Sequence, residues 1–208
     1  MMKECERMIQ ENRAFKEMLK VAKEWLSGKD PVEIEKKTGI FYNREGSCFC
    51  LNSMGKEICI YYPDYEITPY IDEWHQLVIL HYMRLADGAA QTGKWMSMRE
   101  IKDGMIRGGN FELKSEGVIS QRLSRISSDE FLERCQCIGG KISDSNADLT
   151  VRFDFLPRYP LLLKLWFADE EFPASGKLLV EMSADHYLSI EDAVTAGQIV
   201  MESLLGVF

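Results

Sequence analysis

The chain has 208 residues, 46% of them hydrophobic, a length and composition that favour one domain with a sizeable buried core. Asp and Glu (33 residues) outnumber Lys and Arg (25 residues), which gives a net charge of -8 at pH 7. Such an acidic chain lacks the basic surface that tracks phosphates, so we exclude nucleic acid as the main partner.

The amino terminus argues against targeting to a membrane. It carries charges at Lys3, Glu4, Glu6 and Arg7 and has no apolar stretch, so it is not a signal peptide. No apolar run in the chain approaches the roughly 20 residues needed to cross a bilayer. We therefore expect a cytoplasmic protein that does not contact the membrane.

Helical patterns open the chain. Apolar residues from Met8 to Leu26 recur at helical spacing and the pattern ends at Gly28, so residues 1–28 are predicted to form a docking helix. Asp30-Pro31-x-Glu33 then supplies an N-cap, a proline at the first helical position and an acidic third residue. This signature predicts a short helix that closes at Gly39.

Two short runs that contain three cysteines follow. If Met54-Gly55 or residues 53–56 form the turn, the hairpin register places Cys50 opposite Cys59, with Cys48 on the same face. Three thiols on one surface could form a thiolate metal site or a redox pair. They could also be small apolar residues packed under a covering helix, and we favour this interpretation because no CxxC occurs.

The remaining cysteines give no metal signature either. The chain has six cysteines, which we expect to be free thiols in a reducing compartment. Cys135 and Cys137 lie near the end of a predicted helix, where side chains two residues apart diverge, and Cys5 lies near the terminus. We therefore predict no metal ligands.

The middle of the chain reads as helical. Residues 72–86 are apolar on nearly every face, which predicts a central buried helix in which His81 is a hydrogen-bonded core residue. Capping boxes at residues 97–100 and 127–130 each predict the start of a further helix. Gly108-Gly109 looks like an isolated flexible point.

The C-terminal third alternates with the period of strands. Residues 149–155 predict a half-buried strand, and residues 161–167, apolar except for Lys164, predict a strand that is covered on both faces. A third strand at 177–182 and a final helix at 189–205 complete an antiparallel sheet packed by the last helix. The whole chain, 1–208, is thus expected to be one α+β domain with an antiparallel sheet packed by several helices.

Carboxylates surround this predicted strand–helix unit. They are Asp169, Glu170, Glu171, Asp185, Glu191 and Asp192, and His186 lies among them. These side chains could converge on a hard cation or on a cationic substrate. They could equally serve structure, because Ser189-x-x-Asp192 has the form of a capping box and a turn before Phe172-Pro173 is a usual place for solvated charge.

Other signals of chemistry are absent or ambiguous. The sequence contains no GxSxG, GxGxxG, P-loop or HExxH motif. Trp74, Trp95 and Trp166 could line a cofactor pocket, although aromatic residues at such spacings are more often core. As the end of the most apolar strand, Trp166 is expected to be a core residue whose replacement by Ala costs roughly 3 to 5 kcal/mol.

Three segments carry a resemblance to a known family. Residues 80–104, Gly139-Gly140 and residues 165–193 resemble the family known as domain of unknown function 3786, and the spacing agrees through Gly39 and Pro63 upstream. The resemblance points to recurrent motif positions at Trp95, Trp166, Asp169, Glu171, Phe172, Glu191 and Asp192. The chain departs from the family pattern at Glu181, where Asp is usual, and at Ser145-Asn146, where Gly-Asp is usual.

The resemblance implies a type of organism and a metabolic context, but no specific activity. Such proteins occur chiefly in anaerobic bacteria and archaea, and some carry a cysteine-rich iron-sulfur segment, not found here, that suggests corrinoid or one-carbon metabolism. Two hypotheses follow. The first is a binding or accessory module without chemistry of its own, acting through a protein partner or a small molecule. The alternative is an enzyme or cofactor-binding protein whose ligand residues are Trp95, Trp166, Asp169, Glu171, Asp185, His186, Glu191 and Asp192; the sequence names no cofactor.

Overall fold

The computed structural model describes residues 2–206, with side chains from Arg13 onward, so Cys5 and Met8 lie outside the described side chains. The helices are α1 (Met2–Leu26), α2 (Pro31–Thr38), α3 (Glu73–Leu85), α4 (Gly104–Leu123), α5 (Ser128–Cys137) and α6 (Ile190–Leu205), with short 3-10 turns η1 (Met98–Glu100) and η2 (Ala184–His186). The strands are β1 (Phe41–Asn43), β2 (Cys48–Ser53), β3 (Lys56–Tyr61), β4 (Glu66–Thr68), β5 (Trp95–Met96), β6 (Lys141–Ile142), β7 (Leu149–Leu156), β8 (Tyr159–Trp166) and β9 (Ser175–Glu181). The predicted α+β class is confirmed.

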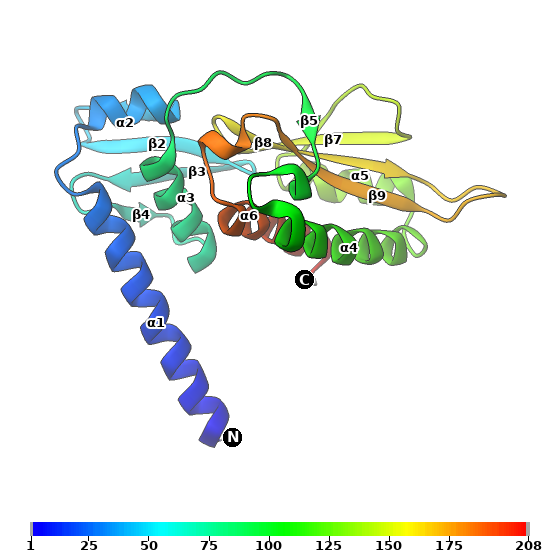
Figure 1. Cartoon of the computed structure of the whole chain (residues 1–208), viewed down its shortest axis with the longest axis horizontal. Helices are drawn as coiled ribbons and strands as arrows, with labels where there is room; N and C mark the ends of the chain where they lie inside the picture. The colour runs from blue at the N-terminus through cyan, green and yellow to red at the C-terminus, as the bar shows by residue number, and fades with distance from the viewer. Residues whose placement is uncertain (1, 207–208) are drawn as a thin grey trace.

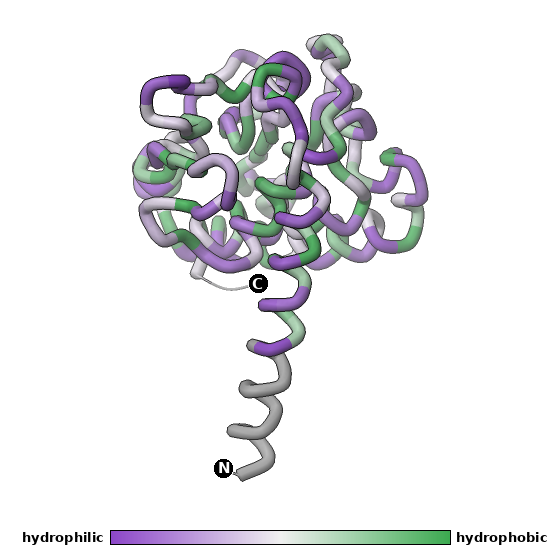
Figure 2. Tube along the Cα trace, turned by 90° about the vertical axis from the view of Figure 1, so that its left-hand side faces the viewer, coloured by the Kyte–Doolittle hydropathy of each residue, from purple (hydrophilic) through white to green (hydrophobic). Residues whose placement is uncertain are grey.

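The strands form two antiparallel sheets (Figure 1). The first is a four-stranded sheet in the order β1-β2-β3-β4, and the second is a five-stranded sheet in the order β5-β9-β8-β7-β6. The predicted cysteine hairpin is the centre of the first sheet, where β1 and β4 extend it on either side. Hydrophilic segments gather in the turns at the periphery (Figure 2).

The apolar strand of the C-terminal sheet lies where its composition predicts. β8 pairs with β7 on one side and with β9 on the other, so it is not an edge strand. Leu161, Leu163 and Leu165 are completely buried on one face, and Leu162 is buried on the other. α4 packs against β9 and α6, and α6 packs against α3. The prediction of a central apolar strand in an antiparallel sheet is confirmed. The predicted packing of the last helix on this sheet is not what the structure shows, because α4 packs on β9 and α6 packs on α3 and α4.

The two capping boxes have different outcomes. Ser127 begins α5 as predicted, because its hydroxyl accepts a hydrogen bond from the Glu130 amide at 3.2 Å. Ser97 begins only the short turn η1, and α4 starts later, at Gly104. The interpretation of Gly108 as a flexible point is wrong. It is buried within α4, where an added Cβ would lie 2.3 Å from the Met98 carbonyl oxygen.

A buried polar contact joins the two sheets through α3. The Ser53 hydroxyl, at the end of β2, donates to the Phe155 carbonyl of β7 at 2.5 Å and lies 2.8 Å from Nε2 of His75. Because the hydroxyl proton is used on the carbonyl, Nε2 of His75 carries its own hydrogen and donates it. Burial lowers the pKa of His75 to about 4, so the ring is neutral at physiological pH.

The N-terminal helix lies along α3. Phe15 packs edge-on against Trp74 at 5.4 Å, and the guanidinium of Arg84 lies 3.3 Å from the ring centroid of Trp25. The Tyr65 hydroxyl donates to the Leu26 carbonyl at 2.8 Å where the helix ends. Among the described residues, none of the helices combines the length and the apolar character that a bilayer crossing requires.

Candidate functional site

The first group of predicted acidic residues lies at the tip of the β8–β9 hairpin. The Asp169 carboxylate accepts hydrogen bonds from the amides of Phe172 at 2.7 Å and Glu171 at 2.8 Å. These two backbone hydrogen bonds, led by the one from Phe172, lower the pKa of Asp169. Asp169, Glu171 and Phe172 are all exposed. The carboxylate therefore closes a turn, as a short Asp side chain commonly does.

The second group lies beyond the opposite end of β9 (Figure 1). β9 has seven residues, which at about 3.3 Å per residue separates its ends by about 23 Å. Asp185 accepts a hydrogen bond from the Lys102 amide at 3.1 Å, and Nδ1 of His186 lies 2.6 Å from a carboxylate oxygen of Asp87. The structure thus does not bring Asp169 and Asp185 to one site.

Glu191 and Asp192 serve the start of α6. The Asp192 amide donates to the Ser189 hydroxyl at 3.2 Å, and that hydroxyl donates to the Asp192 carboxylate at 2.8 Å. The other carboxylate oxygen of Asp192 lies 2.7 Å from Nδ1 of His81, which ties α6 to α3. Glu191 faces Arg107 at 3.7 Å on the surface. The predicted N-cap by Ser189 is confirmed, but the box is only half formed, because the Asp192 carboxylate accepts from the Ser189 hydroxyl and not from its amide. His81 has the predicted hydrogen bond but is half-buried.

The tryptophans do not share a pocket. Trp95 is opposite Glu181 at one end of β9, and Trp166 is opposite Ser175 at the other. Trp74 is exposed at the start of α3. Trp166 is only half-buried, so its assignment as a core residue is wrong. The side chains of a strand alternate between faces, and Trp166 shares its half-exposed face with Lys164 rather than with Leu165.

Glu181 is a buried, fully hydrogen-bonded carboxylate that the sequence did not predict. It is 3% exposed and receives five hydrogen bonds, from the amides of Thr92, Gly93 and Ser183 and from the hydroxyls of Thr92 and Ser183. Burial alone would raise its pKa, but the hydrogen bonds from Ser183 and Thr92 outweigh burial and lower the pKa of Glu181 to about 2. The carboxylate therefore anchors the loop before β5 to the end of β9.

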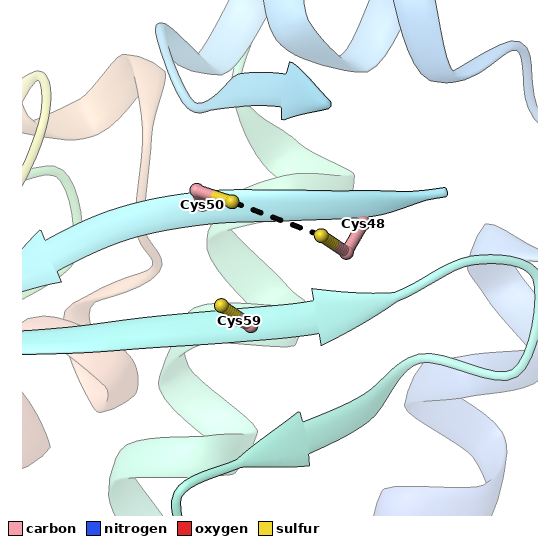
Figure 3. A group of neighbouring side chains, drawn as sticks. All are labelled: Cys48, Cys50 and Cys59. Atoms are coloured by element: carbon pink, nitrogen blue, oxygen red, sulfur yellow. Dashed lines mark hydrogen bonds between the residues drawn. The ribbon is translucent and has the colours of Figure 1, made fainter. Parts of the chain in front are cut away.

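The thiols of the cysteine hairpin do converge. Among the described residues, one group of three or more His, Cys, Asp or Glu side chains can reach a common metal ion, and it consists of Cys48, Cys50 and Cys59. Their Sγ atoms all lie within 4.8 Å of one another, and those of Cys48 and Cys50 are 3.8 Å apart (Figure 3). We call this group the thiol cluster.

The hairpin sequence explains the convergence. Met54 and Gly55 have positive φ angles of 51° and 76°, which are the angles of a tight two-residue hairpin turn. This turn sets the register in which Cys50 pairs with Cys59, and alternation puts Cys48 on the same face. The predicted register is confirmed. The opposite face carries the buried side chains of Phe49, Leu51, Ile58 and Ile60.

The thiol cluster lies on the outer face of the first sheet. Its neighbours on that face include Phe41, opposite Cys50 and 62% exposed, and Tyr61, opposite Cys48 and 45% exposed. Cys50 and Cys59 are themselves half-buried. The covering helix that we expected is therefore not found among the described residues. Helix α3 instead belongs to the core on the other side of the sheet.

Without an ion between the sulfurs, the surroundings of Cys50 favour its neutral thiol. Burial, followed by the hydrogen bond and charge of Cys48 and then by Cys59, raises the pKa of Cys50 to about 12. Several thiolates this close repel one another unless a positive ion lies between them. Two sulfurs that are each about 2.3 Å from a tetrahedral zinc ion are about 3.8 Å apart. The spacing of Cys48 and Cys50 already meets that requirement.

The comparisons with known proteins concern the family alone. The chain matches no curated protein and no solved structure. A family model matches residues 30–203, a span that contains the thiol cluster, both sheets and most of α6. The chain therefore belongs to the family described as Domain of unknown function (DUF3786).

Proposed function

We propose that the protein is a binding module that holds one thiophilic metal ion, such as Zn²⁺ or Cu⁺, between Cys48, Cys50 and Cys59. The observation that carries the proposal is the convergence of three Sγ atoms within 4.8 Å on an accessible sheet face. Thiolates are soft ligands that prefer such ions to Mg²⁺ or Ca²⁺. The sequence favoured packing for these cysteines, but packing does not explain why they lie on the outer face.

The number of ligands supports an exchangeable ion. Within the described part of the chain, the cluster offers three sulfur ligands, whereas structural zinc sites use four. A fourth position then stays open to water, a small molecule or a group of a protein partner. The hairpin is already held by its apolar face, so the fold has no need of the metal. These features fit an accessory module better than a structural zinc site.

The alternative function gains less support. An enzyme that used Trp166 and Asp169 with the acidic residues of α6 would need those side chains in one place, and about 23 Å of β9 lies between the two groups. Asp169 and Asp192 already have structural hydrogen bonds. A cytoplasmic location and a link with anaerobic redox or one-carbon metabolism stay predictions of the sequence.

Metal titration of the reduced protein tests the proposal. The protein is purified anaerobically without an affinity tag, freed of metal and titrated with Zn²⁺, and with Co²⁺ as a spectroscopic substitute. We expect one ion per chain and a sulfur-to-cobalt charge-transfer band. Binding releases protons, because the pKa of Cys50 is about 12, so the affinity should rise with pH.

Matched variants identify the site. Cys50→Ser and Cys59→Ser should each weaken Zn²⁺ binding by about 100-fold or more, since each removes a thiolate ligand. Cys137→Ser, which changes an exposed cysteine at the end of α5, should leave it unchanged. Circular dichroism checks that all three variants fold. Stoichiometric binding that survives Cys50→Ser, or none by the parent protein, would refute the proposal.

A further inference from the structure

We infer that Cys50 and Cys59 also form a reversible disulfide by exchange with a small-molecule disulfide, so that the thiol cluster alternates between a reduced form that binds metal and an oxidised form that does not. The effect on metal binding rests on the proposed function. The disulfide itself follows from the hairpin geometry and needs no metal.

The register singles out the pair. Residues directly opposite in an antiparallel pair alternate between hydrogen-bonded and non-hydrogen-bonded positions. Ser53 and Lys56 close the two-residue turn as a hydrogen-bonded pair, so counting back places Cys50 and Cys59 at a non-hydrogen-bonded position. The Cα atoms of such a pair are about 4.5 Å apart, within the range of about 4.4 to 6.8 Å found in disulfides.

Cys48 is a poorer partner, although its sulfur lies only 3.8 Å from that of Cys50. The two residues are two apart on one strand, so their Cα atoms are about 6.6 Å apart, near the upper limit for a disulfide. Cys48 is also 7% exposed, and its Sγ lies 3.3 Å from where a Cβ on Gly46 would stand. Cys50 and Cys59 are both half-buried and reachable from solvent. Cys48 is thus a metal ligand but not part of the disulfide.

The exchange balances with a small disulfide, RSSR, as the oxidant. One cysteine thiolate attacks a sulfur of RSSR, which forms a mixed disulfide and releases RS⁻. The second cysteine thiolate attacks the protein sulfur of that mixed disulfide and releases the second RS⁻. Two electrons pass from the cysteines to RSSR, and their two protons leave on two RSH molecules. A bound ion then keeps only Cys48 as a ligand and dissociates.

The first experiment uses metal-free protein and oxidised glutathione. The reduced full-length chain is equilibrated anaerobically with mixtures of reduced and oxidised glutathione, alkylated and analysed by peptide mass spectrometry. We expect a peptide pair linked through Cys50 and Cys59 that returns to the thiols when reduced glutathione is in excess. Cys48→Ser should still form this link, whereas Cys59→Ser should stop at the mixed disulfide. A link between Cys48 and Cys50, or glutathione adducts alone, would overturn the inference.

The second experiment adds one equivalent of Zn²⁺ before the oxidised glutathione. We expect disulfide formation to slow by about tenfold or more, because the ion occupies the attacking sulfurs, and a chelating dye to report zinc as the disulfide forms. An unchanged rate with zinc bound would refute the coupling. If the disulfide forms but the reduced chain binds no zinc, the proposed function fails and the disulfide stands. If zinc binds and the disulfide does not form, the inferred disulfide fails and the proposed function stands.

Discussion

The outer face of the first sheet and the two ends of β9 both carry reactive side chains, but they hold them differently. On the first sheet, alternate positions of two paired strands bring three thiols within 4.8 Å of one another. Along β9, one group of carboxylates precedes the strand and another follows it, so the length of the strand keeps them apart. Strand register can therefore assemble a site that clustering of residue types along the sequence cannot.

The largest effect should come from disturbing the turn that sets this register. Gly139→Ala would place a Cβ 2.5 Å from the Gly55 nitrogen, and Gly139 also has a φ of 78°. We expect a loss of about 3 to 5 kcal/mol in the free energy of unfolding, because backbone atoms on both sides must move. Denaturant titration measures the loss.

Gly93→Ala is the matched control for this clash. Gly93 has a similar φ of 73° but no neighbour within 4 Å of an added Cβ, so only the backbone strain remains, about 1 to 2 kcal/mol. Equal losses in the two variants would mean that the contact between Gly139 and Gly55 contributes nothing.

The next effect concerns the carboxylate at the end of β9. The pKa of Glu181 is about 2 in the folded chain, against 4.5 for an unperturbed glutamate. Because the pKa is lowered on folding, the contribution of the Glu181 carboxylate to the free energy of unfolding is complete above pH 4.5 and is lost as the pH falls through 2. The difference corresponds to about 3 kcal/mol. We expect Glu181→Gln to lower the free energy of unfolding by about 3 kcal/mol at neutral pH.

The pH profile separates this contribution from others. Between pH 4.5 and 2 the parent protein should lose stability more steeply than the Glu181→Gln variant, as followed by thermal melting. Glu171→Gln, which changes an exposed carboxylate at the hairpin tip, is the control and should follow the parent. Parallel profiles for the parent and Glu181→Gln would contradict the assignment.

A smaller effect is expected from Trp166→Ala. Because Trp166 is half-buried, the loss should be about 1 to 2 kcal/mol, below the 3 to 5 kcal/mol typical of a buried aromatic residue. Phe153→Ala, at a completely buried position of the neighbouring strand β7, should show the larger loss in the same denaturant titration. A comparable loss in the two variants would mean that Trp166 contributes to stability as a core residue does.

The smallest effect should follow removal of the carboxylate at the hairpin tip. Asp169→Ala deletes the acceptor of two exposed turn hydrogen bonds, so its melting temperature should fall less than that of Gly139→Ala, Glu181→Gln or Trp166→Ala. Its Zn²⁺ stoichiometry should equal that of the parent. A lost ion in Asp169→Ala would instead assign the metal to the acidic residues and reverse the comparison of the two regions.

Local patterns predicted most of the fold. The register of the thiol hairpin depends on Met54-Gly55 alone, and the strand at 161–167 is apolar enough to be placed at the centre of a sheet. β1 and β4 could not be predicted, because three residues are too few to show an alternating pattern. Gly108 was interpreted as flexible because the feature that requires a glycine there, the close approach of the Met98 backbone, comes from another segment of the chain.

The candidate site was predicted in its residues but not in its surroundings. Alternation gives the shared face of Cys48, Cys50 and Cys59, but which face of a sheet is covered depends on where α3 packs, and that is a long-range contact. The separation of the acidic groups could have been inferred, because the predicted strand at 177–182 already stood between Asp169 and Asp185. Side chains that precede and follow one strand are separated by the length of that strand, so they cannot converge on one site.

The contact between Gly55 and Gly139 has an evolutionary consequence. The hairpin turn and the end of α5 meet backbone to backbone, with no room for a side chain at Gly139. A relative that keeps this contact must keep a glycine at that position or alter both segments together. An insertion in the β2–β3 turn should accordingly be accompanied by a change after α5. The end of α5 is thereby coupled to the turn that sets the register of Cys50 and Cys59.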